Sequence, residues 1–160
     1  MAVDMFLKLG DIKGESQDDK HKDTIDVLAW SWGMSQSGTT HMGSGGGAGK
    51  VAVQDLSVTK YVDAASPNLA LACCNGKHFK DALLTVRKAG EKPVEYLKIT
   101  MKEVIISSYS TGGSGGEDRI TENVALNFGE FKVEYTPQDA TGKPGAAIEA
   151  SWNIAKNVKA

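Results

Sequence analysis

Apolar and polar residues alternate along most of the chain with a period of two, the spacing that puts successive side chains on opposite faces of a β-sheet. We therefore predict that strands dominate the fold. The segments with this alternation are residues 3–9, 26–34, 56–58, 84–105, 120–135 and 148–154. Within residues 84–105, the turn-forming residues 89–93 predict a hairpin.

The period changes at residues 66–76, which predict a short helix. Ser66 is placed to cap the free amides of the first turn, and Pro67 suits the first helical position. Gly76 suits the left-handed residue that ends a helix. The apolar positions follow the i, i+3, i+4 spacing of one helical face: Leu69, Ala72 and Cys73.

The alternation slips by one residue inside the segment 120–135. Up to Phe128 the apolar residues occupy even positions, but from Phe131 onward they occupy odd positions. A strand keeps its apolar set on one face through such a slip only if an extra residue is accommodated. The sequence therefore predicts a β-bulge or a sharp bend at Gly129.

Short strands, regular turns and one helix together predict a mainly β fold. We expect a small antiparallel β-barrel of two packed sheets with one short flanking α-helix. A chain of 160 residues has the usual length of one domain, so residues 1–160 are expected to form a single domain.

Composition and charge exclude several classes of protein. The formal net charge is -2, and lysine and arginine are scattered along the chain, so nucleic-acid binding is not indicated. The chain lacks the run of about 20 apolar residues that a membrane span needs. The first residues lack the basic and apolar regions of a signal peptide, so we expect synthesis in the cytoplasm without a cleavable export signal.

The glycine-rich residues 43–50 invite comparison with a phosphate-binding loop. A P-loop needs glycine where Ser44 stands and serine or threonine where Val51 stands. A dinucleotide-binding turn needs a helix next, whereas residues 51–53 read as a strand. These departures favour a flexible connector or an interface arm.

No constellation of residues points to catalysis, a cofactor or a metal. His21, His41 and His78 lie in separate polar loops, and the common hydrolase and metalloprotease motifs are absent. Trp30, Trp32 and Trp152 could form an aromatic ligand platform, but their strand spacing favours the core. No catalytic, cofactor-binding or metal-ligating residue is therefore assigned.

Several blocks of the sequence match one known family from end to end. They are residues 1–8, 26–34, 43–50, 53–57, 59–63, 66–69, 111–119 and 152–154. On these blocks the chain resembles the hemolysin-coregulated proteins (Hcp), the tube subunits of bacterial type VI secretion systems. The resemblance implies a structural protein, not an enzyme, which forms six-membered rings with an open channel.

The resemblance also implies a set of partners and a route out of the cell. Rings of such a protein stack into a tube inside a contractile sheath, with a spike protein of the VgrG type at the tip. The tube is propelled out of the cell without a signal peptide, and some members carry or protect effector proteins in the channel. Neither a nucleic acid nor a membrane is an expected partner.

Ser31 resembles the channel-facing position that the family associates with effector binding. Period-two alternation also places Ser31 opposite Trp30 and Trp32. One conflict remains, because Ile25, Val27 and Ala29 share the parity of Ser31, and such an apolar series would make a poor wall for a water-filled channel. Either these residues lie beyond the channel or a bulge intervenes.

The two glycine-rich segments are the predicted sites of contact between subunits or rings, because glycine backbones allow close approach by a neighbour. The residues assigned to these contacts are Gly43, Ser44, Gly45, Gly46, Gly47, Ala48, Gly49, Lys50, Gly112, Gly113, Gly115 and Gly116. The alternative hypothesis is a monomeric or dimeric barrel that binds carbohydrate or peptide through its tryptophans. The third hypothesis is an enzyme.

Overall fold

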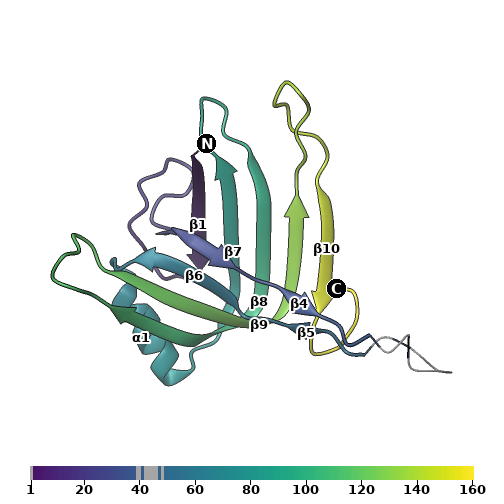
Figure 1. The fold of residues 1–160 in the computed structure, drawn as a ribbon, viewed down its shortest axis with the longest axis horizontal. Coiled ribbons are helices and arrows are strands. Elements are labelled where there is room, and N and C mark those ends of the chain that lie inside the picture. Colours follow the sequence, from purple (N-terminus) through teal and green to yellow (C-terminus); the bar gives the residue numbers. More distant parts are fainter. Residues whose placement is uncertain (1, 39–40, 42–46, 48) are drawn as a thin grey trace.

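The computed structural model describes residues 2–38, 41, 47 and 49–160. These residues form ten strands and one helix (Figure 1). The elements are β1 (Val3–Leu9), β2 (Ile25–Asp26), β3 (Ala29–Ser31), β4 (Met34–Ser35), β5 (Ala52–Val53), β6 (Leu56–Tyr61), α1 (Ser66–Asn75), β7 (Phe79–Lys88), β8 (Glu95–Gly112), β9 (Thr121–Tyr135) and β10 (Ile148–Asn153).

Eight of the strands form one curled antiparallel sheet in the order β2-β1-β7-β8-β9-β6-β3, with β10 paired to β9. Strands β4 and β5 form a separate two-stranded ribbon. Figure 1 shows the large sheet curling into a half-barrel, with α1 beside its lower end. The prediction of a mainly antiparallel β-barrel fold with one short helix is confirmed, and the barrel is open on one side.

The half-barrel curls where β8 and β9 bend together. The two strands pair at Lys102 with Glu130 and at Val104 with Phe128, but the pairing lapses between Glu103 and Gly129. Glu103 has a left-handed backbone with φ of 55°. In each strand the buried positions change parity here, so both strands keep their apolar side chains inside. The register is the same on both sides of Gly129, so of the two predicted alternatives the bend is confirmed and the β-bulge is not found there.

Glu103→Gly is expected to give a more stable protein than Glu103→Ala by about 1 kcal/mol. A residue with a Cβ pays about 1–2 kcal/mol for a left-handed backbone, whereas glycine adopts it freely. Urea unfolding of both variants measures the difference. At the exposed neighbour Lys102, alanine should instead be the more stable choice, and the same order at both positions would contradict the argument.

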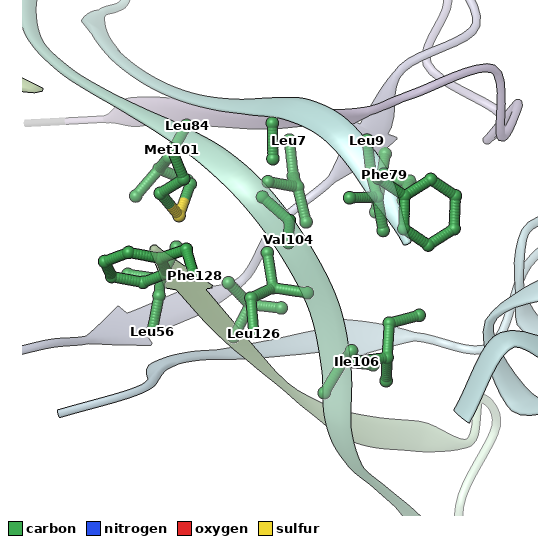
Figure 2. Close-up of a cluster of buried hydrophobic side chains, with 14 of the residues drawn as sticks. Leu7, Leu9, Leu56, Phe79, Leu84, Met101, Val104, Ile106, Leu126 and Phe128 are labelled. Carbon is green, nitrogen blue, oxygen red and sulfur yellow. The ribbon is translucent and has the colours of Figure 1, made fainter. Parts of the chain in front are cut away.

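The core fills the inside of the curl. Figure 2 shows side chains from several strands converging on one apolar cluster. Its fully buried members include Leu7, Leu9, Leu56, Leu84, Met101, Val104 and Leu126. Burying such side chains stabilises the fold by about 1.5–3 kcal/mol each, which makes this cluster the main source of stability.

Helix α1 has the predicted extent but a different start. Gly76 ends it with a left-handed backbone of φ 65°, as predicted. The prediction that Ser66 caps the helix is wrong, because no side chain caps α1 and the residue before the helix is Ala65. The Ser66 hydroxyl instead accepts the Asp63 amide and donates to Glu122. The Ser66 hydroxyl, which was expected to cap the helix, therefore binds the buried Glu122 carboxylate instead.

A buried network of charged and polar groups ties α1 to the sheet. Lys60 and Glu122 are both fully buried, and the Lys60 ammonium donates to the Glu122 carboxylate and to Asp63. Ser66 and Tyr109 also donate to Glu122. Burial alone would raise the pKa of Glu122, but these hydrogen bonds and the Lys60 charge hold it below its usual range. Burial, followed by the bond to Glu122, raises the pKa of Tyr109 to about 12.

A second polar cluster fastens the segment between β1 and β2 to the sheet. The Arg87 guanidinium donates two hydrogen bonds to Asp18, at 2.6 and 3.0 Å, and one to Asp4 at 3.0 Å. Nearby, His21 stacks on the buried Phe6 ring with centroids 4.4 Å apart. This segment therefore covers the face of β1 and β7 that points away from the core.

Asp18→Asn is expected to make the stability less sensitive to acid. The hydrogen bond from Arg87 lowers the pKa of Asp18 from 3.8 to about 2. Since the folded pKa lies below the unfolded one, this stabilisation is complete above about pH 4 and is lost as the pH falls through about 2. Urea unfolding from about pH 5 to about pH 2.5 measures the loss. Asp19→Asn, at an exposed neighbour, is the control, and an equal pH dependence in both variants would contradict the assignment.

Candidate functional site

Ser31 lies on β3, where the chain has just crossed from one edge of the sheet to the other. Strand β2 pairs with β1, whereas β3 pairs with β6. The prediction of one continuous strand over residues 26–34 is therefore wrong. The break resolves the parity conflict, because Ile25 and Val27 are buried in the core while Ala29 and Ser31 are exposed.

Ser31 belongs to a broad polar surface that we call the Ser31 face. Ser31 pairs with Ser57, Ser57 with Ala125, and Ala125 with Ser108. On β6 and β9 the residues that alternate with this row are buried, namely Leu56, Val58, Val124 and Leu126, so the face points away from the core. The Ser31 face consists of Ala29, Ser31, Asp55, Ser57, Thr59, Ser108, Ser110, Asn123, Ala125 and Asn127.

Hydrogen bonds between strands hold the side chains of this face in place. Thr59 Oγ1 donates to Asn123 Oδ1 at 2.7 Å. Asn127 Nδ2 donates to Asp55 Oδ1 at 2.8 Å, and Ser107 Oγ donates to Asp55 Oδ2 at 2.6 Å. The face therefore presents small, ordered hydroxyl, amide and carboxylate groups.

Small, ordered polar groups of this kind suit hydrogen bonding to another molecule. Within the described part of the chain, no group of three or more histidine, cysteine, aspartate or glutamate residues could hold a metal ion. Among the same residues, no helix has the length and apolar character of a membrane span.

The tryptophans lie half-buried against the core. The Trp32 ring meets Phe131 edge-on with centroids 4.9 Å apart, and its Nε1 donates to the Gln54 carbonyl at 3.0 Å. Trp30 and Trp152 also pack against the core cluster. The core interpretation is therefore confirmed, and the tryptophans form no exposed platform.

The first glycine-rich segment lies between β4 and β5 in the chain, and much of it is outside the described residues. Gly43, Ser44, Gly45, Gly46 and Ala48 belong to the part that the structure does not describe. Gly49 continues the ribbon, with its amide donating to the Ser37 carbonyl at 3.3 Å. Gly47, Gly49 and Lys50 are exposed.

The second glycine-rich segment joins β8 to β9 at the end of the sheet opposite the β4–β5 ribbon (Figure 1). Gly112 pairs with Thr121, and a turn closes with Glu117 donating to the Ser114 carbonyl at 3.2 Å. A Cβ atom on Gly112, Gly115 or Gly116 would meet nothing within 4 Å, and one on Gly113 would lie 3.5 Å from Ile120. The second segment therefore lies far from the β4–β5 ribbon, and its glycines have open space beside them.

An apolar groove lies between the β4–β5 ribbon and strands β9 and β10. Its volume is about 390 Å³, and its walls are Met34, Gln36, Val51, Phe131, Val133, Ala150, Ser151 and Trp152. Met34 is 47% exposed, and Ile148, at the start of β10, is 67% exposed. Contiguous exposed apolar surface of this kind is typical of protein interfaces.

The sequence interpretation missed most of the Ser31 face. The signal was present, because the polar residues Ser57, Thr59, Asn123 and Asn127 occupy the positions that alternate with buried apolar residues. What the sequence lacked was the strand order, which brings β3, β6, β9 and β8 side by side.

Comparison with known proteins decides the family. A family model described as "Type VI secretion system effector, Hcp" matches residues 6–135. The chain belongs to the Hcp family. Members of this family are secreted effector and tube proteins of type VI secretion systems.

Individual relatives agree with this assignment. The chain is 65% identical to "Protein hcp1" of Pseudomonas aeruginosa over 162 residues, covering 100% of both chains. A solved type six secretion system protein superposes with a TM-score of 0.93 at 36% identity, covering 99% of this chain and 100% of the other. Hcp1 from Salmonella typhimurium gives a TM-score of 0.82 at 38% identity, covering 100% of both chains. The half-barrel is therefore the Hcp fold.

Proposed function

We propose that this Hcp chain forms six-membered rings that stack into the inner tube of a type VI secretion system. The tube would be propelled out of the cell and would carry effector proteins in its channel. The observation that carries the proposal is that one open half-barrel presents two different surfaces. One is the ordered Ser31 face, and the other is the exposed apolar groove.

The open half-barrel leaves surfaces that a second copy would cover. Strands β2 and β3 end the main sheet, and β10 pairs with β9 alone. Free strand edges and apolar surface favour association. A head-to-tail contact that repeats around a closed ring covers the groove of every subunit and leaves two ring faces for stacking.

The Ser31 face suits the channel wall in this arrangement. Hydroxyl and amide groups keep the wall hydrated and can bond to many different polypeptides, whereas the apolar groove is costly to leave in water. The glycine-rich residues 43–50 and 112–116 are the proposed contacts between subunits or rings, where close approach of backbones is useful.

The proposed partners follow from the family. They are further copies of the chain, a spike protein of the VgrG type, the contractile sheath and effector proteins. We expect synthesis in the cytoplasm and export through the type VI apparatus without a signal peptide.

Native mass spectrometry of the purified protein tests the ring. The expected mass is that of six copies, and it should persist on dilution because a large closed interface dissociates slowly. A mass of one or two copies at high protein concentration would overturn the proposed assembly.

A further inference from the structure

We infer that Asp55 gives the Ser31 face its specificity, by binding the lysine or arginine side chains of a polypeptide lying on that face. This inference rests on the proposed function, because it names the chemistry of the cargo that the channel wall would hold.

The carboxylate of Asp55 is held ready for such a contact. Ser107 Oγ donates to one of its oxygens at 2.6 Å, and Asn127 Nδ2 donates to the other at 2.8 Å. The two donors come from β8 and β9, so the carboxylate is fixed against two different strands. Each carboxylate oxygen has a further lone pair, so a cation can bind without breaking either bond.

Asp55 is also the sole ionisable side chain of the Ser31 face. The other members are serine, threonine, asparagine and alanine. Among the described residues, the lysine and arginine ion pairs involve other carboxylates, and none involves Asp55. The carboxylate is therefore oriented and half-exposed, and its charge is unmatched within the chain.

Two cationic residues associated with β6 do not compensate this charge. Lys60 lies on β6, which begins just after Asp55, but it is fully buried on the opposite side and donates to Glu122. Arg119 lies over the Tyr61 ring, 3.7 Å from its centroid, at the far end of β6. We therefore expect the cation that neutralises Asp55 to come from another molecule.

A ring would increase the attraction between the channel wall and a cationic polypeptide. Six copies would repeat the carboxylate around the channel, and a polypeptide could meet several of them at once. Repeated weak contacts of this kind raise the overall affinity well above that of one contact. Because the carboxylates are half-exposed, the attraction should weaken as the salt concentration rises.

Binding of fluorescently labelled tetralysine and tetra-arginine peptides to the purified protein tests this inference. Fluorescence anisotropy at low salt should show binding of both peptides, and tetraglutamate should not bind. Asp55→Asn, which keeps the side-chain shape, should weaken binding about five-fold or more. Tighter binding of tetra-arginine than of tetralysine would identify the guanidinium as the preferred partner.

Two further variants locate the site. Asp81→Asn removes one exposed carboxylate from β7, outside the Ser31 face, and should leave the affinity unchanged. Ser57→Lys places a positive charge two residues from Asp55 and should weaken binding as Asp55→Asn does. Equal affinities for the parent protein and Asp55→Asn would overturn the inference, as would equal losses for Asp55→Asn and Asp81→Asn.

The mass of each variant keeps this test apart from the proposed assembly. If the parent protein forms rings and Asp55→Asn forms them equally well but binds as the parent does, the inference fails and the assembly stands. If the parent protein remains monomeric, the proposed assembly fails, and the peptide affinities still report whether Asp55 binds cations.

Discussion

Replacing Lys60 with methionine is expected to destabilise the protein by about 3–5 kcal/mol, the usual result of removing one partner from a buried ion pair. Glu122 would then be fully buried with its charge unmatched, and Asp63 would lose the same donor. For a chain of this length, the loss corresponds to a fall in Tm of about 10 °C or more. Thermal and urea unfolding of the purified variant measure it.

A double variant separates the ion pair from the packing of the side chains. Lys60→Met combined with Glu122→Leu removes both charges and keeps apolar volume, so it should recover a large part of the lost stability. The double variant would still lack the acceptor for Ser66 and Tyr109, so full recovery is not expected. A Lys60→Met protein as stable as the parent would contradict the account of this network.

Replacing Met34 with aspartate is expected to weaken ring assembly at least about ten-fold, the largest effect that we predict on association. Met34 lines the apolar groove and is 47% exposed in the single chain. A neighbour that covers the groove would bury the new carboxylate without a partner, which costs several kcal/mol. Sedimentation across a range of protein concentrations measures the change in the dissociation constant.

Leu71→Asp is the matched control for this variant. Leu71 is 59% exposed on α1, away from the groove, so the same change of charge there should leave assembly unaffected. Both variants should keep the stability of the isolated subunit, because exposed positions tolerate substitution. Equal losses of assembly in the two variants would show that the groove is not the interface.

Much of the fold could be predicted from the sequence because the strand signals are local. The parity slip between Phe128 and Phe131 predicted the bend, and Gly76 predicted the end of the helix. The path of residues 25–31 could not be predicted in the same way. Whether Val27 lies in the core depends on β2 pairing with β1 and β3 with β6, and the sequence does not record which strands pair.

The buried network around Lys60 and Glu122 could not be predicted from the sequence either. Lys60 alternates with the half-buried residues Thr59 and Tyr61, and its partner Glu122 is 62 residues away along the chain. Only the pairing of β6 with β9, which places Lys60 opposite Glu122, shows why a lysine can be fully buried there. The same pairing diverts Ser66 from the helix cap that its position suggested.

Electron microscopy of the purified protein tests the central claim most directly. The account predicts rings of six subunits around an open channel, with Ser31, Asp55 and Ser57 facing the channel and the apolar groove of each subunit covered by its neighbour. Small particles without a ring at high protein concentration would contradict it. Rings in which the Ser31 face points outward would contradict the assignment of that face to the channel wall.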